Sequence, residues 1–269
     1  MKRLVISFFL IMTSFLFFIF LYNKNKLKEY SKTYSDFNGI NIRVYISNKP
    51  NKLFDELEYI LEHYDENELY NFGLGVINKT DGYVSIYRKS INDAFEEGKI
   101  KKVKPVYKDS KEIDYSSIIK SFIISKLEQK IKDYNISSYI INMGDISSLG
   151  SANNTKFTVG IEKPYKTDEY ITFLKLSNKA VSTVGPYQNY YTFDSKIYHN
   201  LINLKTLKQE NNYKSVTVIG DNVLDVQMLS NYLYFLSIED GKKIIKKYNC
   251  DAIWYTNDDE LIFTKDFTE

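Results

Sequence analysis

The segment Tyr139–Pro164, with the sequence YIINMGDISSLGSANNTKFTVGIEKP, is the clearest guide to the architecture of this chain. It joins a short apolar run to the turn Met143-Gly144-Asp145 and then to an alternating strand that closes on Glu162-Lys163-Pro164. Such a turn places backbone N–H groups and one carboxylate at a strand end, where ligands commonly bind. The sequence therefore predicts two strands around a turn that faces a ligand site.

A helix is predicted over Ile113–Tyr134, directly before this segment. Apolar residues recur on one side of the helix, while lysines and a glutamine occupy the other side. Ser116 and Ser117 are the predicted N-caps, which puts the unpaired N–H groups of the first turn just after Asp114. Because such groups attract anions, this end of the helix is a candidate phosphate site.

The remaining elements mix strands and helices without a repeat, which predicts an α+β fold in one domain. Strands are expected at Ile40–Ile46, Tyr170–Leu176, Ala180–Val184 and Ser215–Ile219, and hairpins at Tyr187–Leu204 and Ala252–Phe267. Helices are expected at Leu53–His63, Val223–Leu236 and Ile238–Tyr248, with one or two helical turns at Ser90–Phe95. The rest is expected to be a loop at Gly73 and Gly75, a β-like stretch at Val76–Tyr87 and a basic surface loop at Lys99–Lys111.

The N-terminus begins with an uncharged apolar run, Leu4–Tyr22, which is long enough to span a bilayer as a helix. No small-x-small cleavage site follows the run, which favours an uncleaved signal-anchor over a removed signal peptide. Lysines on both sides leave its orientation open. The predicted organisation is an anchor over residues 1–25, a polar linker over 26–37 and a folded domain over 38–269.

Composition excludes several classes of function. The balance of 36 Lys+Arg against 34 Asp+Glu carries no excess charge for a nucleic acid, so no nucleic-acid partner is expected. Cys250 is the single cysteine, so the chain has no internal disulfide, and His63 and His199 alone cannot complete a zinc cluster. Cys250 is expected to be a small buried apolar side chain.

The order of several motifs resembles one family, the ApbE-type FAD:protein FMN transferases, from Ser31 to the C-terminus. The matches lie at Asn38-Gly39-Ile40, Tyr64–Leu69, Thr80–Ser85, Asp114–Ser121, Asn142–Ile146, Gly160–Pro164, Ala180–Gly185 and Ser215–Ile219. The resemblance implies a mixed α/β domain of the ApbE (T-fold-like) type behind the N-terminal transmembrane helix.

The resemblance also implies a reaction. Members split the pyrophosphate of FAD and transfer FMN, with Mg²⁺, to a Thr or Ser hydroxyl of an extracytoplasmic target protein. It follows that FAD would be the substrate and Mg²⁺ the cofactor. An acceptor protein would be the partner, and a membrane-anchored domain would lie outside the cytoplasm.

The resemblance assigns a cofactor-binding set by position. In it a carboxylate would hold the ribose or adenine, an ammonium would face the pyrophosphate and a tyrosine ring would stack on the flavin or adenine. The set comprises Asn38, Tyr64, Tyr83, Val84, Ser85, Asp114, Lys120, Gly144, Asp145 and Gly185.

The family's metal pair, an Asp and a Thr four residues later, aligns with Gln227 and Asn231, with Ser117 as the carbonyl donor. The i, i+4 spacing keeps both side chains on one helix face. A neutral amide nevertheless replaces the carboxylate that Mg²⁺ usually binds. Asp225 is two residues away from Gln227 and is expected to point elsewhere.

The family's His-Ile-Ile-Asp-Pro-x-Thr-Gly segment aligns with Asn200–Leu207, where Thr206 is retained. The histidine position is taken by Asn200, and His199 precedes it by one residue, on the opposite face of a strand unless a bulge intervenes. His199 and Thr206 are the catalytic candidates.

Three hypotheses remain from the sequence. The first is a membrane-anchored FMN transferase. The second is a non-catalytic descendant that binds flavin or a partner protein, favoured by the substitutions at Gln227, Asn231, Asn200 and Asn203. The third is a structural surface protein without a ligand.

Overall fold

The computed structural model describes residues 27–264 except 38, 88–112, 152–154, 167, 194 and 207. Its centre is one eight-stranded sheet in the order β1-β2-β3-β4-β7-β12-β13-β14, in which every neighbouring pair is antiparallel. The strands are β1 (Lys28–Tyr34), β2 (Ile40–Ile46), β3 (Tyr139–Asn142), β4 (Ile146–Leu149), β7 (Lys179–Val184), β12 (Ser215–Gly220), β13 (Asp251–Tyr255) and β14 (Leu261–Phe263).

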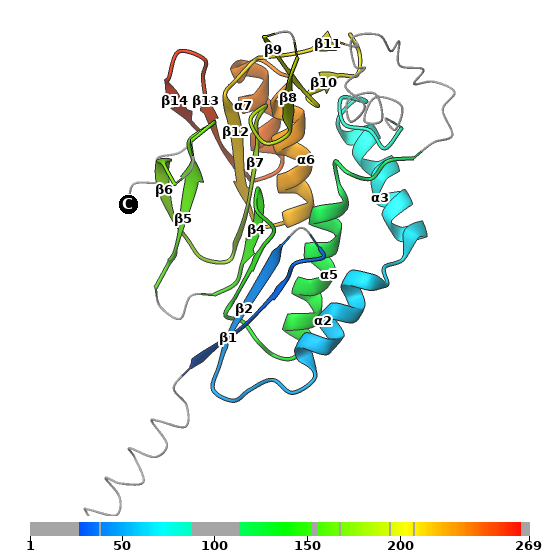
Figure 1. Ribbon diagram of the computed structural model, residues 1–269, viewed down its shortest axis with the longest axis vertical. Helices are drawn as coiled ribbons and strands as arrows, with labels where there is room; N and C mark the ends of the chain where they lie inside the picture. The colour runs from blue at the N-terminus through cyan, green and yellow to red at the C-terminus, as the bar shows by residue number, and fades with distance from the viewer. Residues whose placement is uncertain are drawn as a thin grey trace, which may run out of the picture.

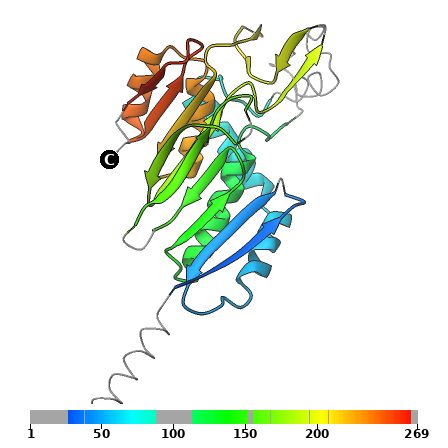
Figure 2. The ribbon, with the colours of Figure 1, turned by 60° about the vertical axis from the view of Figure 1, so that its left-hand side comes forward.

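Helices cover one face of this sheet, as Figures 1 and 2 show. They are α2 (Leu53–Glu62), α3 (Glu66–Lys79), α5 (Ile119–Asp133), α6 (Val223–Leu233) and α7 (Ile238–Lys247). The main core lies between helices and sheet, where Leu127 of α5, Leu229 of α6 and Trp254 of β13 are fully buried. Removing this apolar surface from water is the main force that holds the helical layer on the sheet.

A short hairpin of β5 (Phe157–Glu162) and β6 (Tyr170–Leu176) covers part of the opposite face (Figure 1). A second, smaller core forms there, in which Leu174 of β6 packs with Val181 of β7 and Ile219 of β12. Since β12 is covered on both faces, all of its residues are buried, in agreement with its nearly continuous apolar sequence. The predicted ligand-facing segment therefore spans two sheets, with β3 and β4 in the large sheet and β5 in the hairpin.

Two small antiparallel ladders complete the described part. They are β8 (Tyr190–Phe193) with β9 (Lys196–His199), and β10 (Ile202–Asn203) with β11 (Lys208–Gln209). The β8–β9 ladder confirms the hairpin predicted around Ser195. The strands predicted at Ile40, Tyr170, Ala180 and Ser215, the helices at Leu53, Val223 and Ile238, and the C-terminal hairpin are also confirmed.

Three local predictions are wrong. The predicted linker contains β1, whose seven residues pair with all of β2. The predicted loop and the start of the β-like stretch, Val76–Lys79, instead belong to α3, and Thr80–Tyr87 forms turns and bends rather than a strand. The helix is capped by Asp65, which accepts from the amides of Asn67 at 2.8 Å and Glu68 at 3.0 Å. Gly73 lies inside that helix, and the position requires glycine because a Cβ there would lie 2.6 Å from Ile86.

The predicted N-caps of α5 are also corrected. The helix begins at Ile119 with Ile118 as N-cap and no side-chain cap bond. Asp114 instead accepts from the amide of Ser116 at 2.7 Å, so an Asx turn precedes the helix. The end near Asp114 is therefore a turn, and in the first turn of α5 the amide of Ile119 donates to the Tyr115 carbonyl and the amide of Ser121 to Gln227.

Several predictions fall on residues outside the described ones, namely the anchor at Leu4–Tyr22, the turns at Ser90–Phe95 and the loop at Lys99–Lys111. Among the described residues, no helix combines the length and apolar character needed to cross a bilayer. Cys250 is buried as predicted, and burial raises the pKa of its thiol to about 11.

Candidate functional site

A cavity of about 720 Å³ lies where β4 meets β7, between the start of α5, α6 and the β5–β6 hairpin. This volume is within the range of roughly 300–1,000 Å³ that small-molecule sites occupy. The predicted site residues that line it are Ser117, Lys120, Gly144, Asp145, Gly185, Gln227 and Asn231, together with Asn200. Residues far apart in the sequence thus converge on one cavity.

The turn between β3 and β4 supplies Gly144 and Asp145. Asn142 holds this turn, because its Oδ1 accepts from the Gly144 amide at 3.0 Å and from the Ser147 hydroxyl at 3.1 Å. Gly144 has φ of 75°, a left-handed conformation that glycine adopts without steric cost. The Asp145 carbonyl accepts from the Thr183 amide at 2.9 Å, which ties the turn to β7.

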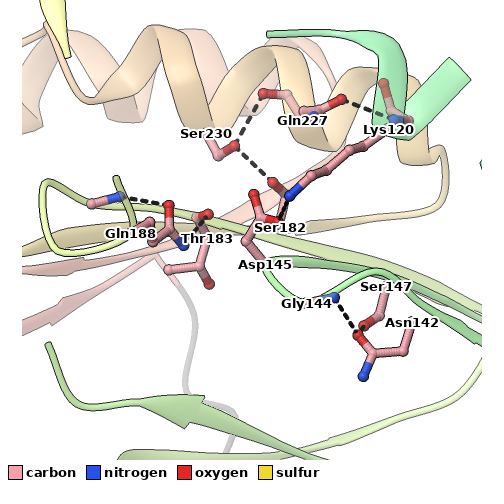
Figure 3. Close-up of polar contacts among 12 residues, drawn as sticks. Lys120, Asn142, Gly144, Asp145, Ser147, Ser182, Thr183, Gln188, Gln227 and Ser230 are labelled. Carbon is pink, nitrogen blue, oxygen red and sulfur yellow. Dashed lines mark hydrogen bonds and ion pairs between the residues drawn. The ribbon is translucent and has the colours of Figure 1, made fainter. Parts of the chain in front are cut away.

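Lys120, in the first turn of α5, reaches across to form an ion pair with Asp145 (Figure 3). The two side chains are 27% and 26% exposed, so both charges remain accessible from the cavity. A phosphate would compete with the carboxylate for this ammonium, since charge-assisted hydrogen bonds to lysine are strong for either anion. The pair therefore makes this wall an accessible, charged part of the cavity.

Neutral polar groups make a second wall beside Lys120, at the α5–α6 junction (Figure 3). Gln227 Oε1 accepts from the Ser121 amide at 2.9 Å, and the Gln227 carbonyl accepts from Asn231 Nδ2 at 2.9 Å and from the Ser230 hydroxyl at 3.0 Å. The Ser230 hydroxyl also lies 3.0 Å from that of Ser182 on β7. These bonds join both helices and the sheet.

Ser117 lines the cavity just before α5. Its Oγ is buried and has no hydrogen-bond partner within the described part of the chain. A buried hydroxyl without a partner costs roughly 1–3 kcal/mol, which a bound polar ligand would recover. Ser117 is thus a free donor and acceptor at the entrance to α5.

The end of β7 closes the cavity. Gln188 Oε1 accepts from the Gly185 amide at 3.2 Å, and its Nε2 donates to the Thr183 carbonyl at 3.0 Å. A Cβ on Gly185 would lie 2.6 Å from Tyr187 and 2.7 Å from the Lys214 carbonyl, so close packing requires glycine there.

Sequence reasoning missed Ser182, Thr183 and Gln188, which all line the cavity. A signal existed for the first two, because they lie in the segment matched to the family's strand that ends in Thr-Ser-Gly. No motif marks Gln188.

Aromatic residues lie in and near the cavity lining. Tyr187 lines it and contacts Tyr165, whose ring centroid lies 5.4 Å from that of Tyr190. Tyr170 and Phe173 lie against Gly160, which also lines the cavity, as the contacts of a Cβ placed at Gly160 indicate. Burial raises the pKa of Tyr187 to about 12, so its phenol is neutral. The Tyr187 ring gives a flat ligand a stacking surface in the cavity.

Other predicted cofactor residues do not line the cavity. Tyr64 packs edge-on against Phe122 at 6.4 Å, and Tyr83 packs against Tyr232 at 5.5 Å. Val84 and Ser85 are buried beside α3, and the Asp114 amide donates to the Ile86 carbonyl at 2.8 Å. Asn38 lies outside the described residues.

The two catalytic candidates also lie away from the cavity lining. His199 is fully buried, its Nε2 is 2.9 Å from Asn211 Oδ1 and its Nδ1 accepts from the Leu201 amide at 3.3 Å. These contacts assign the proton to Nε2, and burial lowers the pKa of the imidazole while the bond to Asn211 opposes that shift. Thr206 is exposed, and its amide donates to Asn203 at 3.4 Å. Asn200 and Leu201, which follow His199 in the sequence, do line the cavity.

The residues at the implied Mg²⁺ position do not fit that ion. Mg²⁺ is usually held by carboxylates and phosphates, whereas Gln227 and Asn231 are neutral and already hydrogen-bonded. Asp225 points elsewhere, as predicted, and lies 3.7 Å from Lys79. Among the described His, Cys, Asp and Glu residues, no group of three or more could hold a metal ion.

Comparison with known proteins identifies related chains. A family model described as the ApbE family matches residues 40–254. An FAD:protein FMN transferase of Buchnera aphidicola subsp. Baizongia pistaciae (strain Bp) is 31% identical over 136 residues, which cover 49% of this chain and 40% of that protein. An FAD:protein FMN transferase of Klebsiella pneumoniae (strain 342) is 26% identical over 157 residues, covering 57% and 48%. The chain thus spans about half the length of these curated relatives.

Solved structures share the fold over nearly the whole chain. The flavin transferase ApbE from Vibrio cholerae superposes with a TM-score of 0.68 at 14% identity, covering 88% of this chain and 96% of that one. The ApbE protein from Thermotoga maritima MSB8 superposes with the same score at 15% identity and the same coverage. At these identities the superpositions establish a common fold.

Proposed function

Because the chain belongs to the ApbE family, whose model matches residues 40–254, we propose that it is an FAD:protein FMN transferase with its flavin site in the cavity at the β4–β7 junction. One observation carries this proposal. Lys120, Gly144, Asp145 and Gly185, drawn from three separate motifs, line a single cavity. A random set of motif matches would not converge in this way.

The cavity suits the chemistry of a flavin dinucleotide. The Lys120 ammonium and the unpartnered Ser117 hydroxyl are donors for the pyrophosphate, and the ring of Tyr187 suits a flat heterocycle. In the transfer, the acceptor hydroxyl oxygen bonds to the phosphorus of the FMN half, the bond between the two phosphates breaks, AMP leaves and the hydroxyl proton is released. The role of the chain is to bind and orient FAD.

Mg²⁺ is not part of this proposal, since Gln227 and Asn231 do not fit it. The acceptor would present a Thr or Ser hydroxyl to the cavity.

We also propose that the apolar run Leu4–Tyr22 anchors the chain in a membrane with the folded domain outside the cytoplasm. The uncharged character and length of that run support the anchoring, and the family resemblance supports the side of the membrane.

The full-length chain tests the proposal when it is incubated with FAD and a Thr-bearing flavinylation domain. In-gel flavin fluorescence of the acceptor is the expected result, and Lys120→Ala should reduce it. Lys243→Ala, at an exposed position on α7, is the matched control. An acceptor that stays colourless under every condition, with FAD unbound, would refute the proposal.

A second candidate function rests on His199. Because this imidazole is buried and both its nitrogens are hydrogen-bonded, it is not positioned to act as a base in the cavity. This observation favours a flavin-binding descendant without transfer activity. FAD binding with no covalent product would select it.

A further inference from the structure

We propose that the α5–α6 junction holds no divalent cation, because the Gln227 side chain acts there as a hydrogen-bonded clasp between the two helices and Asn231 is bonded within α6. The clasp stands at the positions that the family resemblance assigns to Mg²⁺. The inference goes beyond flavin transfer, since it concerns what these side chains do before any substrate binds.

The oxygen of Gln227 already has a partner. It accepts from the Ser121 amide at 2.9 Å, so the positive end of an N–H dipole points at it from the first turn of α5. A magnesium ion would have to lie roughly 2 Å from that oxygen and share it with this hydrogen. Repulsion between the ion and the N–H would oppose binding, and moving the amide away would leave the buried Ser121 N–H unpaired.

Asn231 is turned toward its own helix. Its Nδ2 donates to the Gln227 carbonyl at 2.9 Å, the same carbonyl that accepts from Ser230. The i, i+4 spacing that places two ligands on one helix face therefore serves here to tie one turn of α6 to the next.

The nearby charged residues do not make up for the missing carboxylate ligand at the junction. Asp145 is paired with Lys120, whose ammonium would itself repel a second cation in the same cavity. Glu162, the other carboxylate of the lining, lies on β5 in the hairpin rather than on α5 or α6. A dication at the junction would thus meet neutral amides and a fixed positive charge.

The clasp explains why position 227 carries an amide. Gln227 is 4% exposed and links α6 to α5, while Ser230 extends the link to Ser182 on β7. A carboxylate at position 227 without a cation would place an unpaired charge among these groups, which is costly. An amide gives the same reach without the charge.

The inference can be tested with the metal alone. The full-length chain in mild detergent is titrated with Mn²⁺, and binding is followed by electron paramagnetic resonance. We expect no stoichiometric Mn²⁺ binding in the millimolar range, with or without EDTA pretreatment of the protein. One bound Mn²⁺ per chain that is lost in Gln227→Met would overturn the inference.

Thermal unfolding gives an independent readout. Gln227→Met keeps the shape but removes the acceptor, so Tm should fall by roughly 3–6 °C. The Tm of the wild type should be the same in MgCl₂ and in EDTA, because a ligand bound only by the folded state would raise it. A Tm that rises with MgCl₂ in the wild type but not in Gln227→Met would contradict the clasp.

FAD binding, measured by flavin fluorescence in EDTA and in MgCl₂, separates this inference from the proposed function. Equal affinity in both buffers supports the clasp. If FAD does not bind in either buffer, the proposed function fails, while the manganese and melting results still decide the inference.

Discussion

The two walls of the cavity use polar groups in opposite ways. On one wall, Lys120 and Asp145 pair in partial contact with solvent, and the turn that carries Asp145 is held by Asn142. On the other wall, Gln227 and Ser230 are buried and satisfied by the fold itself. The difference indicates that the charged wall is available to a ligand, whereas the neutral wall stabilises the packing of α5 on α6.

The largest expected effect lies on the charged wall. Lys120→Ala removes the ammonium and leaves Asp145 facing the phosphates, so FAD affinity should fall on the order of 10- to 100-fold, as for loss of a charge-assisted hydrogen bond. Fluorescence titration measures this change. Because the pair is partly exposed, the free energy of unfolding should change by only about 1 kcal/mol or less. An unaltered Kd would remove the distinction between the walls.

Ser230→Ala tests the neutral wall. It leaves the Ser182 hydroxyl buried without its partner, so the free energy of unfolding should fall by about 1–2 kcal/mol in urea denaturation. The double variant Ser182→Ala/Ser230→Ala removes both hydroxyls and should recover part of that loss. Strictly additive losses would show that the two hydroxyls do not interact.

Gly144→Ala tests the turn that supports the charged wall. No atom lies within 4 Å of a Cβ there, so only the left-handed backbone is penalised, at about 1 kcal/mol. Gly75→Ala is the matched control, because its Cβ also meets nothing within 4 Å but it lies inside helix α3. That control should gain roughly 0.5–1 kcal/mol of stability. If both substitutions changed the free energy of unfolding in the same direction, backbone conformation would be excluded as the cause.

Substitution of His199 should have the smallest effect on stability at neutral pH. Burial lowers its pKa in the folded state below the ordinary value of 6.5, so the unfolded chain takes up the proton first as the pH falls. The free energy of unfolding should therefore decrease as pH drops from about 6.5 toward the folded-state pKa, and His199→Gln should flatten this decrease. Urea midpoints across this range measure it. A profile unchanged by the substitution would place the titrating group elsewhere.

The order of motifs along the sequence predicted much of the fold and part of the site. The turn at Met143-Gly144-Asp145 and the shared face of Gln227 and Asn231 were predictable, because each depends on local spacing. The family resemblance placed Lys120 in the site, but its ion pair with Asp145 depends on the folded chain. Gly73 was interpreted as a loop residue because its role depends on Ile86, which packs against it only after folding.

The orientations of side chains were less predictable than the positions of the backbone segments that carry them. Tyr64, Tyr83 and Asp114 match motif positions, but their side chains do not line the cavity, because packing against Phe122 and Tyr232 and a local turn set their orientation. The pairing of β5 with β6 in a sheet of its own depends on contacts with β7 and β12, which no local pattern encodes. A motif match thus locates a backbone segment and not the contacts of its side chains.

The antiparallel pairing of β4 with β7, from Ile146 opposite Ser182 to Leu149 opposite Lys179, joins an earlier part of the chain to a later one. The cavity lies across this strand pairing, here called the seam, so a molecule bound in the cavity would touch both parts of the chain and oppose their separation. Amide hydrogen exchange would report that effect. The Thr183 amide, bonded to the Asp145 carbonyl across the seam, would exchange more slowly when the cavity is filled. A bound molecule would then stabilise a long-range pairing of the sheet, between two strands that the β5–β6 hairpin separates in sequence.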